Sequence, residues 1–474
     1  TMGLGLTKRA LNKSLNNNLT QQLKVEGDLQ TIAGRSHDYN EGVAAFLEKN
    51  ELPCYVFDST FAEFELLKTA LLEKKPDVVC MYVNLMTRLR VLDVIAFIKE
   101  ALPQTHIILG GPDVRYNAEE LLQHGADYII IGEGELSSLE LINALKKNAL
   151  TTIEDIQGLA FLKDAKVHFT EERVKLKIID ELPFPARNKI NLAAYQEVWR
   201  KHHGMSTISI STMRGCPYTC KWCSRAVYGL SYRRRSPELV VDEIEHIYNT
   251  YQPDSLWFVD DVFTVNHKWL RQFNAAIKKR GLKISYECIS RADRMNEEVI
   301  ELLKESGCFR VWIGAESGSQ KVIDLMDRRV DVNKVRDMIL ATREAGMEAG
   351  TFIMLGYPGE TEEDILETIH HLKSSNPHHF TITVAYPIKG TELFTEIEHK
   401  QTKNFNWTEN TDRDRDFERA YNRKYYDYAV RRVVNEVKYH QKKQSGQQYS
   451  PSALRMKANY SLASLGMWIE RKRS

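Results

Sequence analysis

Three cysteines, Cys216, Cys220 and Cys223, lie within eight residues of one another. Three thiolates on so short a loop can bind three irons of a four-iron, four-sulfur cluster and leave the fourth iron open to a small ligand. A closed structural zinc site has four ligands, so a zinc site here would also need His202 or His203. The spacing therefore predicts an iron-sulfur cluster ligated by the three cysteines, with a zinc site as the alternative.

The cysteine count and the charge balance limit the class of protein. Seven cysteines is an odd number, and three of them lie close together, which suits metal ligation in a reducing compartment better than a disulfide framework. The other four have no partner at ligand spacing and are expected to be small buried side chains: Cys54, Cys80, Cys288 and Cys308. The 65 Lys and Arg against 64 Asp and Glu argue against bulk attraction to nucleic acid. With no apolar run of about 18 residues, we expect a soluble, cytoplasmic, multidomain enzyme.

The cysteine loop follows the first of six expected strands that alternate with helices. These strands are Thr207 to Thr212, Ser255 to Val259, Ile284 to Ser290, Val311 to Gly314, Thr351 to Leu355 and Phe380 to Val384. Six strand-helix units are too few for an eight-stranded barrel and favour a partial (β/α)6 TIM barrel, with its chemistry on the loops after the strands. Helix boundaries are marked by Ser236 with Pro237, by Asn296, and by Thr361 with Asp364.

A second alternation of strand and helix precedes the barrel. Its expected strands are Tyr55 to Phe57, Val78 to Val83, His106 to Leu109 and Tyr128 to Ile131, with a poorly marked first strand within Leu23 to Ile32. This rhythm predicts a Rossmann-like, doubly wound parallel sheet. Two of the strands end in glycine-bearing loops, and such loops form either a crevice for a large planar ligand or simple tight turns. The loop residues are Gly110, Gly111 and Pro112, and Gly132, Glu133, Gly134 and Glu135.

The expected boundaries follow from these two alternations. We predict an α/β chain with a Rossmann-like domain at 1–148, a linker at 149–203, a partial barrel at 204–400 and a helical C-terminal region at 401–474. The linker has two strand-like stretches, Gly158 to Leu162 and Val174 to Ile179, and becomes rigid at its prolines.

The motif Cys-x-x-x-Cys-x-Trp-Cys, at the end of the first strand of a six-unit barrel, resembles that of the radical SAM superfamily. The resemblance implies that the open iron binds the amino and carboxylate groups of S-adenosylmethionine. An electron from the cluster then breaks the sulfonium bond and produces a 5'-deoxyadenosyl radical. Further strand ends match the family in order, and the roles they imply are the following. Trp222 lies beside the adenine, Asp260 and Asp261 bind the methionine amino group, Arg291 pairs with its carboxylate, Glu316 and Ser317 reach the ribose and carboxylate, and Gly356 and Pro358 approach the adenine.

The N-terminal half resembles the cobalamin-binding part of one radical SAM subfamily. The resemblance rests on Gly-Gly-Pro, on Gly-Glu-Gly-Glu about twenty residues later, and on Leu-Pro-Phe-Pro-Ala-Arg at Leu182 to Arg187. It implies that both glycine loops bind cobalamin and that Asn84 lies in a third loop against the corrin. None of the fourteen histidines lies in an Asp-x-His-x-x-Gly motif, which excludes ligation of cobalt through that motif. A degenerate domain without cobalamin is the alternative.

The resemblance implies an enzyme that methylates an unactivated carbon of a small-molecule or lipid-like substrate, with an electron donor such as flavodoxin or ferredoxin. Three alternatives are cyclisation or ring rearrangement, methylthiolation, and a non-catalytic corrinoid carrier or sensor. Methylthiolation would need a further cluster-binding cysteine set, and the complete cysteine loop argues against the carrier or sensor. The basic, aromatic tail predicts a solvated face, a segment that helps to cover the active site, or a segment that docks at an anionic surface such as a membrane that carries a lipid substrate.

Overall fold

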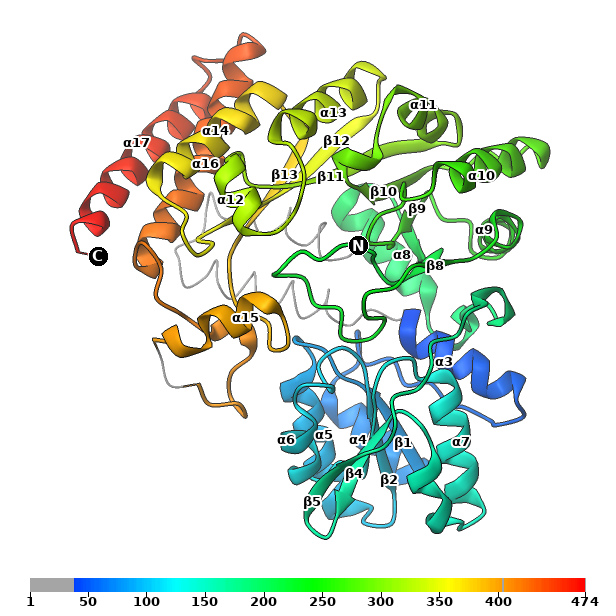
Figure 1. Cartoon of the computed structure of the whole chain (residues 1–474). Helices are drawn as coiled ribbons and strands as arrows, with labels where there is room; N and C mark the ends of the chain where they lie inside the picture. Colours follow the sequence, from blue (N-terminus) through cyan, green and yellow to red (C-terminus); the bar gives the residue numbers. More distant parts are fainter. Residues whose placement is uncertain (1–37, 403–404, 474) are drawn as a thin grey trace. The chain divides into compact units, whose positions relative to one another are not determined.

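The computed structural model describes residues 38–402 and 405–473, and it divides into two compact units (Figure 1). The first unit contains the described residues up to Pro217, together with Ser224–Asp254 and Asn406–Asp412. The second contains Tyr218–Cys223, Ser255–Phe405 and the described residues from Arg413 onward. The weak strand expected within Leu23 to Ile32 lies outside the described residues.

The first unit is built on a five-stranded sheet of order β1-β2-β3-β4-β5. Strands β1 (Val78–Tyr82), β2 (His106–Gly110) and β3 (Tyr128–Ile130) are parallel, whereas β4 (Leu159–Lys163) and β5 (Lys166–Phe169) are antiparallel to their neighbours. Alternate residues of β2 face opposite sides of the sheet. Ile107 and Leu109 pack with α5 (Arg88–Ala101) and α6 (Ala118–Gln123), and Ile108 packs with α7 (Glu135–Lys146). Helices on both faces confirm the predicted doubly wound arrangement.

Two of the expected N-terminal strands are absent from the described chain, and one strand was not foreseen. Residues 55–57 form no strand, and the side chain of Tyr55 is 66% exposed. Residues 174–179 also form no strand, because Val174 and Ile178 point to solvent instead of packing on a neighbour. The hairpin β4–β5 turns instead at Asp164 and Ala165, which both have positive φ, as a two-residue hairpin of type I′ requires. Asp-Ala is a weak signal for that turn, since glycine usually occupies its second position.

The second unit contains β9 (Ser255–Phe258), β10 (Tyr286–Ser290), β11 (Cys308–Glu316), β12 (Glu348–Leu355) and β13 (His379–Val384). Consecutive strands of this set pair in parallel, and the six-stranded sheet has the order β13-β12-β11-β10-β9-β6, with β6 at Thr207–Ile210. The predicted partial barrel is therefore confirmed, and all six expected strands are present. Its strand ends deliver the loops on which the site is built.

Three helices, α9, α11 and α14, begin where the sequence signals place them. Asn296 accepts from the Val299 amide at the start of α11, and Thr361 and Asp364 form the capping box of α14. The helices of and around the barrel are α9 (Pro237–Tyr251), α10 (His267–Lys279), α11 (Glu297–Glu305), α12 (Gln320–Leu325), α13 (Val332–Glu344), α14 (Glu362–Ser375) and α15 (Glu392–Ile397). Those of the first unit's flanks are α3 (Asp38–Lys49), α4 (Phe64–Lys74) and α8 (Leu192–His203).

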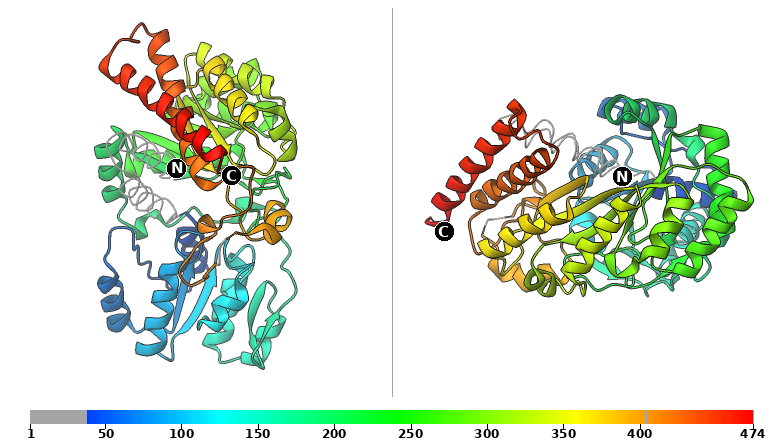
Figure 2. Two further views of the ribbon diagram at one scale, coloured as in Figure 1. Left: turned by 90° about the vertical axis from the view of Figure 1, so that its left-hand side faces the viewer. Right: turned by 90° about the horizontal axis from the view of Figure 1, so that it is seen from above.

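The C-terminal region forms two long helices, α16 (Arg423–Gln444) and α17 (Pro451–Arg471), which pack side by side (Figure 2). Gly466 allows the close approach, because a Cβ there would lie 2.5 Å from Cδ1 of Tyr428. None of the described helices combines the length and the apolar composition needed to cross a bilayer.

Candidate active site

The cysteine loop is held by its own backbone and by glycine geometry. Gly215 has φ +81°, and a Cβ there would lie 2.6 Å from the carbonyl oxygen of Ser231, so only glycine fits before Cys216. Further along, the Lys221 amide donates to the Met326 carbonyl and the Cys223 amide to the Cys220 carbonyl. These bonds fix the second half of the motif.

The three cysteines differ in exposure. Cys216 is half-buried, Cys220 is buried and Cys223 is exposed. Among the residues that the structure describes, no three His, Cys, Asp or Glu side chains are grouped around one point as ligands of a single metal ion would be. Thiolates that bind three separate irons do not need to converge in that way. The ligand set Cys216, Cys220 and Cys223 stays a prediction.

The sulfur of Cys220 lies beside two buried guanidinium groups. Nη1 of Arg291 is 3.7 Å from its Sγ, and Nη1 of Arg328 is 4.0 Å from it. Both arginine side chains are nearly fully buried. A cysteine that ligates iron carries negative charge, and two guanidinium groups at this distance would offset it. The surroundings of Cys220 therefore fit the predicted cluster.

Arg291 is held by several further contacts. Its Nε donates to Asp293 Oδ1 at 2.9 Å, its Nη2 donates to the Arg328 carbonyl at 2.7 Å, and its guanidinium lies 3.8 Å from the ring centre of Tyr218. The structure thus places Arg291 at the cysteine loop as predicted from the motif order. Its predicted pairing with a substrate carboxylate is not tested by these contacts.

Arg328 is a residue that the sequence did not single out. Its Nη2 donates to the Gly314 carbonyl at 2.8 Å, its Nη1 lies 3.5 Å from Glu316 Oε1, and its guanidinium is 5.7 Å from the ring centre of Trp222. It therefore joins Cys220, Trp222 and Glu316, which the sequence predicted as site residues. No strand end or motif marks Arg328, because it follows the short helix α12.

Glu316 occupies a strained position at the end of β11. Its φ is +65°, which is uncommon for a residue with a side chain, and the pairing register with β12 shifts at this point. Burial raises the pKa of Glu316, and the nearby positive charge of Arg328 partly opposes that effect. Ser317, by contrast, uses its hydroxyl locally, since its Oγ accepts from the Ser319 amide and contacts the Thr368 hydroxyl at 3.2 Å.

Asp260 and Asp261 follow β9 as expected. Asp260 is buried. Loss of solvation, followed by the negative charge of Asp260, raises the pKa of Asp261 to about 6. A cationic ligand would relieve both effects, so the pair suits an ammonium group.

Strand β12 ends in Gly356, which has φ +78°. Its amide donates to Glu360 Oε2 at 2.5 Å, and its carbonyl accepts from Arg419 Nε at 3.2 Å. Burial raises the pKa of Glu360 to about 8. Trp222 and Met354 both pack against the apolar cluster that contains Tyr357, the residue before Pro358. Glu360 and Arg419 were not foreseen.

In the first glycine loop of the N-terminal sheet, one position can be occupied only by glycine. Gly111 has φ +117°, and a Cβ there would lie 2.4 Å from the carbonyl oxygen of Val83. Asn84 lies in the neighbouring loop, where its Oδ1 accepts from the amides of Met86 and Thr87 at 2.8 and 3.0 Å. Gly110 and Pro112 flank Gly111 at the end of β2, as predicted.

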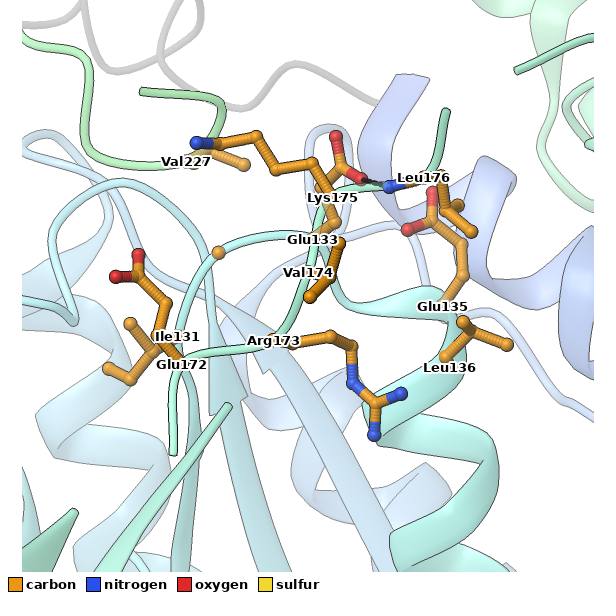
Figure 3. A pocket seen from close by; sticks show the side chains of 11 residues that line it. Ile131, Glu133, Glu135, Leu136, Glu172, Arg173, Val174, Lys175, Leu176 and Val227 are labelled. Carbon is orange, nitrogen blue, oxygen red and sulfur yellow. Dashed lines mark hydrogen bonds between the residues drawn. The ribbon is translucent and has the colours of Figure 1, made fainter. Parts of the chain in front are cut away.

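The second glycine loop carries buried acids that pair with arginines. Glu133 accepts from the Leu176 amide at 3.1 Å and pairs with Arg233 at 2.5 Å. Glu135 pairs with Arg214, two residues before Cys216. Figure 3 shows the pocket beside Glu133 and Glu135, whose volume of about 20 Å³ leaves room for about one water. Both carboxylates are thus already paired with groups of the protein. Gly132 (φ +89°) precedes Glu133, and Gly134 lies between the two acids. Their contact with cobalamin stays a prediction.

Two domain families match this chain. Residues 31–142 match the B12 binding domain, and residues 210–372 match the radical SAM superfamily. The chain belongs to the radical SAM enzymes that carry a B12-binding domain. The cofactors of this family are a [4Fe-4S] cluster, S-adenosylmethionine and cobalamin, as the sequence predicted.

Curated relatives include both methyltransferases and a cyclase. An uncharacterized methyltransferase of Pyrococcus horikoshii is 31% identical over 310 residues, which are 64% of this chain and 66% of the relative. The hopanoid C-3 methylase of Methylococcus capsulatus is 26% identical over 70% of this chain and 63% of its own. The anaerobic magnesium-protoporphyrin IX monomethyl ester cyclase of Cereibacter sphaeroides is 25% identical over 71% of this chain and 56% of its own. The similarity thus spans somewhat more than half of each relative's length.

Two solved structures share the fold. The methyltransferase TsrM of Kitasatospora setae, with cobalamin and a [4Fe-4S] cluster bound, superposes with a TM-score of 0.65 at 17% identity over 76% of this chain and 71% of TsrM. The cobalamin-dependent radical enzyme OxsB, with aqua-cobalamin bound, gives 0.66 at 15% identity over 92% of this chain and 78% of OxsB. At this identity the likeness concerns the fold, and it agrees with the Rossmann-like sheet and the partial barrel.

Proposed function

We propose that this chain is a C-methyltransferase that activates an unactivated carbon of a small-molecule or lipid-like substrate by reductive cleavage of S-adenosylmethionine. The methyltransferases among its relatives support this direction, and the match to the Pyrococcus methyltransferase has the highest identity of those described above. An electron donor of the flavodoxin or ferredoxin class would supply the electron.

The observation that carries the proposal is the environment of Cys220. A buried sulfur with guanidinium groups at 3.7 and 4.0 Å is a site for an anionic metal ligand and not for an inert core cysteine. Arg328 links this sulfur to the buried carboxylate of Glu316. The guanidinium of Arg328 also lies 5.7 Å from the ring centre of Trp222. Charged and aromatic side chains are thus grouped at one end of the barrel strands.

The chain's residues have distinct tasks in the proposed reaction. When bound, the cluster and S-adenosylmethionine supply a carbon radical and cobalamin carries the methyl group. Cys216, Cys220 and Cys223 would hold the cluster. Asp261 would accept hydrogen bonds from the ligand's ammonium group, and Glu316 from its ribose. Gly356 and Trp222 would hold the adenine. The loops at Gly111 and Gly132 would hold the cobalamin.

Cyclisation or ring rearrangement is the second candidate, and the similarity to the protoporphyrin ester cyclase favours keeping it. Both reactions would use the same residues around Cys220. They differ in the fate of the methyl group, because only methylation transfers it to the product.

The experiment follows the methyl group. Anaerobically reconstituted protein is incubated with S-adenosylmethionine deuterated in its methyl group and with candidate lipid and small-molecule substrates, and products are analysed by mass spectrometry. We expect a product that is heavier by a deuterated methyl group. Consumption of substrate without label in the product would assign the cyclase reaction instead.

The Cys220→Ala variant tests the role of the loop. It should lose the iron-sulfur absorbance and release no 5'-deoxyadenosine, because the cluster needs each thiolate. Cys80 was expected to be buried, but it is exposed. Cys80→Ala removes this cysteine outside the loop and is the matched control, which should keep both. Equal deoxyadenosine release by both variants would contradict the assignment.

A further inference from the structure

The outer side of α17 carries a continuous row of exposed apolar residues. Leu454, Ala458, Leu462, Leu465 and Ile469 follow one another at spacings of four, four, three and four residues, so they lie on one side of the helix. All five are exposed, and the side chains of Leu462 and Leu465 are 66% and 53% exposed. We call this row, together with the adjacent Trp468, which is 54% exposed, the outer face of α17.

The opposite side of α17 fixes the helix in the fold. Ala453, Ala463 and Met467 are buried, and Gly466 packs against Tyr428 of α16. In both views of Figure 2, α17 (red) is the outermost of the C-terminal helices. Its apolar outer face is therefore not the core side of a helix that has been turned outward. The helix already has a buried side, and the outer face is additional.

The exposed charges of α17 and of the residues that follow it are basic. Arg455 and Lys457 lie in its first turns, and Lys472 and Arg473 lie at its end, next to Arg471, which pairs with Glu362 of α14 at 2.9 Å. The ammonium group of Lys472 lies 3.8 Å from the ring centre of Trp468. The only acid of the helix, Glu470, is buried and pairs with Arg473 at 2.9 Å.

This combination selects one kind of partner. An exposed row of Leu, Ile and Trp side chains with Lys and Arg beside it is the pattern of a helix that lies in the plane of a membrane interface. In a symmetric dimer through this face, each partner would contribute the same basic residues, and the contact would bring like charges together at both ends of the helix. An anionic bilayer accepts the apolar row and the basic side chains at the same time.

We propose that the outer face of α17 docks the protein on the surface of an anionic membrane. The helix lies flat, with its apolar row in the boundary between headgroups and acyl chains and with its basic residues among the lipid phosphates. The inference concerns an interaction surface and is read without substrate, so its outcome is independent of the reaction proposed above.

The test compares binding to vesicles of phosphatidylcholine alone with binding to vesicles that also contain phosphatidylglycerol, by flotation of the full-length reconstituted protein. We expect binding to the anionic vesicles that weakens as salt is added, because screening reduces the charge attraction. Equal binding to both kinds of vesicle, or binding to neither, would overturn the proposal.

Paired variants separate the apolar and the charged contributions. Leu465→Ser with Trp468→Ser should weaken vesicle binding about tenfold or more, whereas Leu366→Ser, an exposed leucine of α14, should have no effect. Arg455→Glu with Lys457→Glu should weaken binding to the same extent, whereas Lys268→Glu with Lys279→Glu, the same change of charge on α10, should leave it within about twofold. Equal losses in the variants and their controls would contradict a specific face.

Two control measurements test whether the variants keep their cofactors and whether the outer face of α17 forms a dimer. Iron and cobalamin contents of every variant should equal those of the unaltered protein, since all the altered side chains are exposed. Light scattering after size exclusion should give the same mass for the unaltered protein and for the Leu465→Ser, Trp468→Ser variant. A dimer that this variant dissociates would assign the face to a second copy of the chain and reject the membrane.

Discussion

At the scale of single residues, the sequence pointed to only one of the two arginines beside Cys220. Arg291 follows a strand end in a recognisable motif order, and its Nη1 lies 3.7 Å from Sγ of Cys220. Arg328 has no such signal, because it comes after a short helix and acquires its place only when the chain folds back to Gly314. Its contacts with Cys220 and Glu316 are long-range, so local sequence patterns cannot contain them.

Replacement of Arg328 should change the electronic properties of the site. The Arg328→Met variant removes a positive charge about 4 Å from Sγ of Cys220. We expect the midpoint potential of the cluster to fall by on the order of 50 to 100 mV. The reduced cluster is the more negative form, so it loses more stabilisation than the oxidised form when the positive charge is removed. Protein-film or dye-mediated titration measures the shift. Arg329→Met removes the neighbouring charge, which is exposed and paired with Asp327, and is the control that should shift the potential far less.

The pKa of Asp261 predicts a pH dependence of ligand binding. Loss of solvation and the charge of Asp260 raise this pKa to about 6, and the carboxylate binds an ammonium group only after it has lost its proton. The affinity for S-adenosylmethionine should therefore rise about tenfold between about pH 5 and about pH 7 and then level off. Asp261→Asn should bind weakly at every pH. Asp337→Asn, at an exposed position of α13, should retain the full dependence, as isothermal calorimetry can show.

At the scale of elements, the strands that the sequence predicted best are those with buried apolar runs between helices. Among the barrel strands, β9 is buried at each of its four positions and β10 at four of its five. The N-terminal errors have the opposite cause. Residues 55–57 are apolar, but they have no neighbouring strand to pair with. Strand β5 was missed because its pairing with β4 depends on an Asp-Ala turn, which is a weak sequence signal.

Two glycine substitutions separate the effect of a steric clash in the loop after β2 from the effect of a positive φ alone. Gly111→Ala adds a Cβ that would lie 2.4 Å from the Val83 carbonyl, so the loop must move. We expect stability to fall by about 2 to 4 kcal/mol and cobalamin content to fall well below one per chain. Gly204→Ala has the same kind of positive φ but open space around it, so it should cost only about 1 kcal/mol and leave cobalamin content unchanged. Thermal unfolding and the corrin spectrum after desalting give the two readings.

At the scale of the whole molecule, the compact units are not continuous in sequence. Residues Asn406–Asp412 belong to the first unit, although the chain before and after them belongs to the second. Trp407 donates from Nε1 to Asn117 Oδ1 at 3.0 Å, and its ring centre lies 4.9 Å from the guanidinium of Arg88. Arg88 is fully buried and also donates to the Asn410 carbonyl at 2.5 Å. No composition change marks this return of the chain, so a division of the sequence into consecutive segments could not include it.

The returning segment should stabilise the first unit specifically. Trp407→Ala removes a half-buried aromatic ring and leaves the buried charge of Arg88 less well enclosed. The expected loss is about 2 to 4 kcal/mol, and it should be confined to the unit that contains α5 and α6. Hydrogen exchange should therefore become faster in Arg88–Ala101 and Ala118–Gln123 and stay unchanged in α16 and α17. Trp468→Ala, which removes an exposed indole, should change neither region, and faster exchange throughout Trp407→Ala would show instead that the two units unfold together.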